Sequence, residues 1–98
     1  MEIKIAGLNY KILDKDDSDM NGTIGLANFN TQEIWINKAH TEQTRSLARI
    51  HEVLHIIEQA YGIELTEKQV TILAHGITAC INDNKHLLSF VLTGAGRL

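Results

Sequence analysis

The spacing of the apolar residues changes once along the chain, near residue 40, and this change divides the chain into two kinds of structure. Before residue 40 the apolar residues alternate, as in "EIKIAGLNYKIL", "TIGLANFN" and "EIWINKA". A period of two is typical of strands buried on one face. After residue 40 they recur every three or four positions, as in an amphipathic helix. We therefore expect an α+β protein with a small, mostly antiparallel N-terminal sheet packed on two main helices.

Several turn signals divide the N-terminal part. Gly7 interrupts the first alternating run and predicts either a strand pair or one bulged strand. The acidic segment 14–22, "DKDDSDMNG", predicts a solvated loop, because its spacing departs from that of a calcium-binding EF-hand. In the last alternating run, Ile34 and Ile36 should point to one face of the sheet, and Trp35 to the other.

Two helices are predicted after residue 40. Thr41 is suited to cap the first helix, and Gly62 is suited to end it. The second helix should begin near Thr66 and end at residues 82–84, whereas residues 85–98 are compatible with a short helix or a strand, followed by a frayed "TGAGRL" tail. The expected buried stripe of the first helix comprises Leu47, Ile50, Leu54, Ile57 and Tyr61. The corresponding face of the second comprises Val70, Leu73, Ala74, Ile77 and Ile81.

Composition and charge exclude several classes of protein. The 98 residues are expected to form one domain, 1–98, and the 44% hydrophobic and 21% charged residues are typical of a globular chain. The net charge of −3 and the lack of a Lys/Arg cluster predict no nucleic-acid partner. The single cysteine, Cys80, fits a reducing compartment and is expected to be a buried thiol. No apolar run is long enough to cross a bilayer, and the charged first residues do not resemble a signal peptide, so we expect a cytoplasmic protein.

The first predicted helix carries an H-E-x-x-H pattern, His51-Glu52-Val53-Leu54-His55. Residues four apart lie on one face of a helix, so His51 and His55 can reach one metal ion. Glu52 projects from an adjacent face, where it can take a proton from a zinc-activated water. The alternative is that two histidines and a glutamate share a helix without chemical purpose. His40 and His86 lack partner spacing and are expected at the surface.

A catalytic zinc site needs a third protein ligand. The metzincin extension is excluded, because Glu58 and Tyr61 occupy the positions of its Gly and third His. Glu58 is also a poor ligand, since it lies only one turn beyond His55 on the same straight helix. The remaining candidates are Glu64, Glu67 and His75. An antiparallel packing of the two helices favours Glu67, because the first turn of the second helix then returns toward the end of the first.

The chain resembles the minimal zincin-type metallopeptidases encoded in phage and prophage genomes, which are distant relatives of the ImmA/IrrE metallopeptidases. The resemblance covers roughly residues 2–84. It runs through "KIAGLNYKI", "NGTIGLANFNTQEIWINKAHTEQ" and "LARIHEVLHIIEQAYGIELTEKQVTILAHGITACINDN". It implies that His51, His55 and Glu67 bind Zn²⁺ and that Glu52 is the general base. It also implies a peptide or protein substrate and a place in the cytoplasm of a bacterial host.

We therefore expect zinc-dependent hydrolysis of a peptide bond. The run "EIWIN" or its partner strand could hold an extended substrate by strand addition, with Trp35 either touching the substrate or covering the core. Tyr61 is a candidate donor to the developing oxyanion. The alternative is a non-catalytic adaptor or regulatory protein in which zinc, or no metal, joins the helices. A helical regulator that binds nucleic acid is disfavoured by the acidic charge balance.

Overall fold

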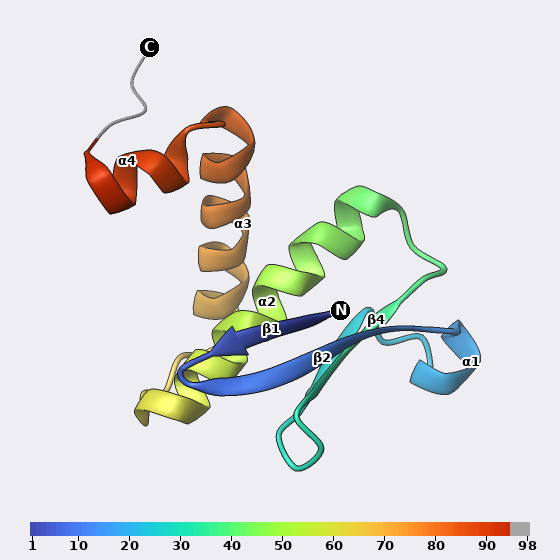
Figure 1. Cartoon of the computed structure of the whole chain (residues 1–98). Helices are drawn as coiled ribbons and strands as arrows, with labels where there is room; N and C mark the ends of the chain where they lie inside the picture. Colours follow the sequence, from blue (N-terminus) through green and yellow to red (C-terminus); the bar gives the residue numbers. More distant parts are fainter. Residues whose placement is uncertain (95–98) are drawn as a thin grey trace.

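The computed structural model describes residues 1–94 and has the expected α+β class (Figure 1). The N-terminal part forms a sheet, and the C-terminal part forms helices. The elements in chain order are β1 (Glu2–Ile5), β2 (Leu8–Lys15), α1 (Asp17–Met20), β3 (Gly25–Asn28), β4 (Glu33–Asn37), α2 (Glu42–Tyr61), α3 (Glu67–Asp83) and α4 (Leu87–Thr93).

The four strands form one mixed sheet in the order β1-β2-β4-β3. β1 and β2 are antiparallel and are joined by Ala6 and Gly7, whose φ values of 50° and 85° suit a two-residue type I′ turn. β3 and β4 are also antiparallel, but β4 is parallel to β2. The expectation of a mostly antiparallel sheet therefore holds for the outer pairs and misses the central one. The chain passes from β2 to the outer edge at β3 and returns between them as β4.

The acidic segment was expected to be a loop, but it contains the short helix α1. Met20 is buried, and this burial holds the segment against the body of the molecule. The Nδ2 of Asn37, at the end of β4, donates to Oδ1 of Asp17 at 2.6 Å and to the carbonyl oxygen of Thr23 at 3.1 Å. These hydrogen bonds satisfy a fully buried amide. The segment is thus ordered by a contact with β4, which the local sequence pattern does not predict.

The helix α2 crosses one face of the sheet and contacts β1, β3 and β4. Its buried residues are Ala48, Glu52 and Ile56. Ala48 and Ile56 belong to a core with Ile5, Tyr10, Ile34 and Ile36. None of the three buried residues belongs to the expected stripe, although Ile57 of that stripe packs against the core. Leu47, Ile50, Leu54 and Ile57 are half-buried beside this face, and Tyr61 is 68% exposed.

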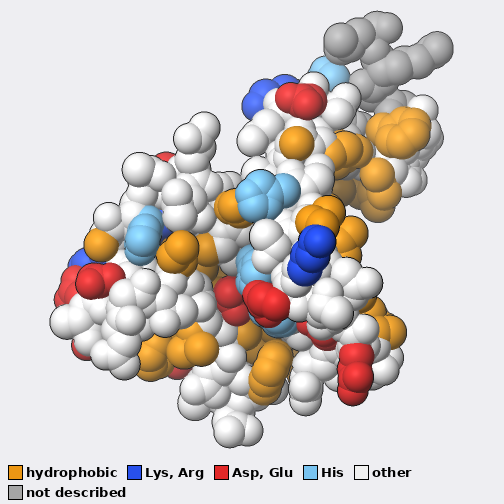
Figure 2. Space-filling view, turned by 180° about the vertical axis from the view of Figure 1, so that it is seen from behind, with side chains coloured by type: hydrophobic (Ala, Val, Ile, Leu, Met, Phe, Trp, Pro, Cys, Tyr) orange, Lys and Arg blue, Asp and Glu red, His pale blue; other side chains and the backbone are white. Residues whose placement is uncertain are grey.

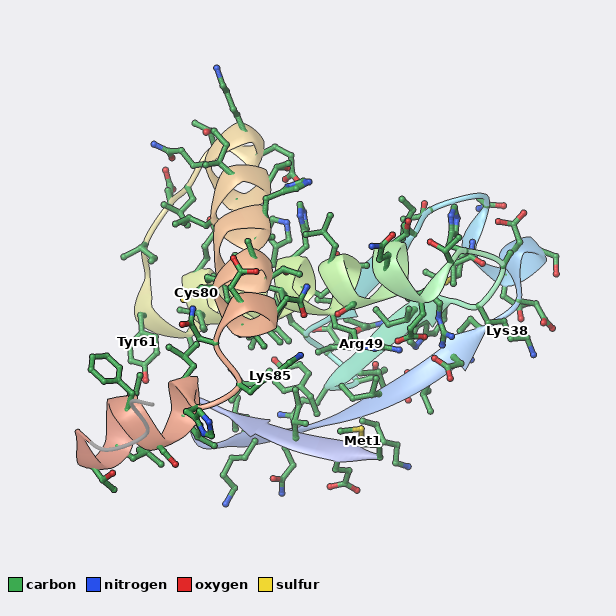
Figure 3. The ribbon with its side chains drawn as sticks, turned by 90° about the horizontal axis from the view of Figure 1, so that it is seen from above. Met1, Lys38, Arg49, Tyr61, Cys80 and Lys85 are labelled. Carbon is green, nitrogen blue, oxygen red and sulfur yellow. The ribbon has the colours of Figure 1, made fainter. Side chains whose placement is uncertain are left out.

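The second long helix, α3, packs on α2 and rises away from the sheet (Figure 1). Its buried residues are Val70 and Ala74, as expected, whereas the rest of its predicted apolar face is exposed: Leu73, Ile77 and Ile81. Cys80 is exposed too, so the expected buried thiol is wrong (Figure 3). α3 contributes a buried face only in its N-terminal half, because its C-terminal half extends beyond the end of the packed layer.

A short helix or a strand was expected after residue 84, and the structure has the helix α4 there. None of its residues is buried, and it lies beside the end of α3 that is remote from the sheet (Figure 1). Residues 95–98 of the "TGAGRL" tail lie outside the described residues. Among residues 1–94, no helix is long and apolar enough to span a membrane.

Candidate metal centre

His51 and His55 lie one turn apart on α2 and face each other, with their ring centroids 4.9 Å apart. The helix begins where the sequence predicts, because the Oγ1 of Thr41 accepts a hydrogen bond from the Thr44 N–H at 3.3 Å. Both imidazoles are half-buried. They therefore lie at the border between the packed core and solvent, where two ring nitrogens can converge on one ion.

Glu67, the first residue of α3, meets both histidines. Its Oε1 lies 2.6 Å from Nε2 of His51, and its Oε2 lies 3.5 Å from Nε2 of His55. Two local features bring it there. Gly62 ends α2 in the left-handed conformation, with φ of 67°, and Thr66 starts α3 with a capping box. The chain thus reverses within a few residues and places the first carboxylate of α3 over the histidines.

This group has the donor set of a catalytic zinc site: two imidazole nitrogens and one carboxylate oxygen. One ligand atom from each of His51, His55 and Glu67 lies within 4.8 Å of the others. Ligand atoms about 2.0–2.1 Å from one tetrahedral ion lie roughly 3.3 Å apart. To admit the ion, the 2.6 Å contact would open by less than about 1 Å, and a pair at the 4.8 Å limit would close by about 1.5 Å. The residue types are therefore compatible with zinc after small side-chain movements. Within residues 1–94, no other group of three such side chains converges in this way.

The other proposed ligands lie elsewhere. The Nδ1 of His75 lies 2.9 Å from the backbone oxygen of Thr71 on its own helix, and Glu64 is exposed in the connection between α2 and α3. Glu58 touches His55 on the ring nitrogen opposite to the one that faces Glu67. Neither His40 nor His86 belongs to the group; His86 is exposed, as expected, and His40 is half-buried.

Glu52 is buried, with only 7% of its surface exposed, and its carboxylate lies against β3. A Cβ on Gly25 would lie 3.1 Å from both Cγ and Oε2 of Glu52. The Glu52 carboxylate accepts a hydrogen bond from the backbone N–H of Ala27. Burial raises the pKa of Glu52, against the opposing effects of His51 and His55. A buried carboxyl with a raised pKa beside two histidines is typical of a proton-transferring group.

The candidate metal group, formed by His51, His55 and Glu67, opens into a cleft of about 550 Å³ between α2 and the β3 segment. Figure 2 shows histidine and acidic side chains gathered in a hollow on this face. The cleft is lined by Thr23, Ile24, Gly25, Leu26, Ala27, Phe29, Thr44, Leu47, Ala48, His51, Glu52, His55 and Glu67. The candidate base and the candidate ligands therefore face a space large enough for part of a peptide.

Two residues suggested as substrate contacts lie outside this cleft. Trp35 belongs to β4, inside the sheet; its Nε1 donates to Oε1 of Glu33 at 2.9 Å, and the Lys15 ammonium lies 4.4 Å from its ring centroid. Tyr61 ends α2, about 15 Å along the helix axis from His51, and is exposed (Figure 3). The free edge next to the cleft belongs to β3, the partner of the run "EIWIN".

Sequence reasoning missed two residues that shape the site. Gly25 leaves room for Glu52, and Glu58 binds His55 and the connection to α3. The hydrogen bond from the Leu65 backbone N–H, assisted by His55, lowers the pKa of Glu58. The position of Glu58, three residues after His55 on the same helix, was a signal for this contact. The contact of Gly25 with Glu52 joins two distant segments and had no local signal.

A comparison of the chain with models of protein families, with curated proteins and with solved structures finds no match.

Proposed function

We propose that this chain is a small zinc-dependent peptidase of the minimal zincin type. The observation that carries the proposal is the convergence of Glu67 with His51 and His55, while the buried Glu52 faces the same cleft. The three converging residues would hold the ion. When bound, zinc acidifies a coordinated water and polarises the substrate carbonyl. Glu52 takes the proton of the attacking water and passes it to the leaving amine.

The free edge of β3 supports a peptide substrate. The backbone N–H of Asn37 donates to the carbonyl oxygen of Ile24, so these residues form a hydrogen-bonded pair. Such pairs alternate along an antiparallel ladder, and the backbone groups of Gly25 and Ala27 therefore turn away from β4. Ala27 already donates to Glu52. An extended peptide added to this edge would pass beside Glu52 and the metal ligands.

Metal analysis and two substitutions test the proposal. The purified chain should contain close to one zinc per molecule, and Glu67→Ala should lose it. Glu52→Gln should retain the zinc and lower hydrolysis of an unfolded protein such as casein by about 10²-fold or more. Glu64→Gln is the matched control, because Glu64 is an exposed glutamate outside the metal group. A wild-type chain without metal, or a Glu52→Gln chain with undiminished hydrolysis, would refute the proposal.

A structural zinc site in a non-catalytic adaptor is the second candidate. It is favoured by the sparse packing of α3, in which Val70 and Ala74 are the buried residues. An ion shared between α2 and α3 would add a link where the core is thin. In that case zinc is bound and raises the unfolding temperature, but neither the wild type nor Glu52→Gln hydrolyses peptides.

A further inference from the structure

The Glu58 carboxylate binds two groups from different parts of the site. Its Oε1 lies 2.9 Å from Nδ1 of His55, and its Oε2 accepts the Leu65 backbone N–H at 2.8 Å. The side chain is 14% exposed, so solvent competes little for these bonds. The backbone oxygen of Glu58 also accepts N–H groups from Gly62 and Ile63, where the chain leaves α2. Glu58 therefore contacts the ring of one candidate ligand and the connection that leads to another.

The contact with His55 selects a tautomer of that ring. An ionised carboxylate can only accept hydrogen bonds, so the proton of a neutral His55 must lie on Nδ1. The lone pair then lies on Nε2, the nitrogen that faces Glu67. This is the nitrogen that a metal ion between His55 and Glu67 would require. Histidine ligands in metal sites are commonly held by a carboxylate in this manner.

The contact with Leu65 positions the third candidate ligand. Leu65 lies in the connection between α2 and α3, after the left-handed residue Gly62 and two residues before Glu67. The Thr66 capping box begins α3 at the next residue. The Leu65 bond therefore fixes the direction in which α3 starts, and with it the place of the Glu67 carboxylate.

We propose that Glu58 is a positioning residue that prepares both helices for the metal, by setting the His55 tautomer and by tying the start of α3 to the end of α2. The inference rests on the proposed metal centre. It assigns Glu58 a role different from that of a ligand, because its carboxylate lies on the far side of the His55 ring from Glu67.

Two substitutions test the contacts of Glu58 with His55 and Leu65. Glu58→Gln keeps the size of the side chain, but its amide NH₂ can only donate, so it cannot accept both from His55 and from Leu65. Glu58→Ala removes both contacts. Gln59→Ala is the matched control, because Gln59 is the exposed neighbour on the same helix. Both Glu58 variants should bind zinc about 10- to 100-fold more weakly than the wild type in chelator competition, whereas Gln59→Ala should not.

A second measurement reads the tautomer without metal or activity. The ¹⁵N chemical shifts of the His55 ring, recorded with chelator at a pH where the imidazole is neutral, should show the proton on Nδ1 in the wild type. Glu58→Gln should shift the population toward the other tautomer. An unchanged tautomer, or wild-type zinc affinity in a folded Glu58→Ala chain, would overturn the inference. If the wild type binds no zinc, the proposed function fails, and the tautomer measurement still decides the role of Glu58.

Discussion

At the residue scale, the burial of the ionisable Glu52 makes the free energy of unfolding depend on pH. Burial raises its pKa in the folded chain, so the folded state binds the proton more tightly than the unfolded state. Above the folded pKa, ionising Glu52 therefore reduces the free energy of unfolding. Below the ordinary glutamate pKa of about 4.3, the carboxyl is protonated in both states and the reduction is absent.

We predict that Glu52→Gln stabilises the metal-free chain. A neutral amide avoids the cost of burying a charge and can still accept from the Ala27 N–H. With chelator present, the variant should unfold at a higher temperature than the wild type near neutral pH. The difference should shrink as the pH falls through the raised pKa of Glu52. Equal unfolding temperatures at neutral pH would contradict the stated cost of ionisation.

Gly25 is the second residue whose effect can be tested. A Cβ there would lie 3.1 Å from Cγ and Oε2 of Glu52 and 3.4 Å from the Cβ of Ala48. We predict that Gly25→Ala displaces the Glu52 carboxylate and lowers hydrolysis, while zinc affinity stays near that of the wild type. Both are measured on the same preparation.

The control for Gly25 is Gly76→Ala. A Cβ at Gly76 meets nothing within 4 Å, and the residue is exposed within α3. This variant should be more stable by about 0.5–1 kcal/mol, since alanine favours a helix interior more than glycine does. It should leave hydrolysis unchanged. Unimpaired hydrolysis in Gly25→Ala would show that Glu52 tolerates the added methyl group.

At the scale of elements, the turn between α2 and α3 determines whether Glu67 meets His51 and His55. Gly62 has φ of 67°, which costs an L-residue with a Cβ about 1–2 kcal/mol. We predict that Gly62→Ala lowers the free energy of unfolding by about this amount in urea titration and weakens zinc binding. Gly62→Asn should cost less, because asparagine tolerates the left-handed conformation. Equal losses for both would argue against a backbone cause.

The sheet illustrates what local patterns predict poorly. Period-two spacing predicted the strands, and Gly7 predicted either a strand pair or one bulged strand; the structure has the strand pair. The parallel pairing of β2 with β4 depends on the path through α1 and β3. That path is held by the burial of Met20 and by the hydrogen bonds of Asn37, which connect residues far apart in the chain.

At the scale of the whole molecule, zinc should stabilise the fold if it binds as proposed, because the proposed ligands come from two helices. A ligand that binds only the native state at 100 times its Kd adds about 2.7 kcal/mol. For a chain of this length, this corresponds to a rise in unfolding temperature of roughly 10–20 °C. We predict such a rise on adding zinc to the metal-free chain, and its loss in Glu67→Ala. An equal rise in wild type and Glu67→Ala would place the bound zinc outside this group.

The sequence by itself determined the features that depend on neighbouring residues. Thr41 and Thr66 cap their helices and Gly62 ends α2 because capping and left-handed turns are local. The four-residue spacing of His51 and His55 places both rings on one face of α2 for the same reason.

Only the tertiary structure decided which further groups join these rings. Glu67 meets them through the packing of α3 on α2, and Glu52 is enclosed because Gly25 lies beside it on β3. It also decided which face of α2 is buried, since Ala48 and Ile56 face the sheet. These contacts depend on how distant segments share buried surface and backbone hydrogen bonds. The spacing of residues within one segment therefore does not predict these contacts.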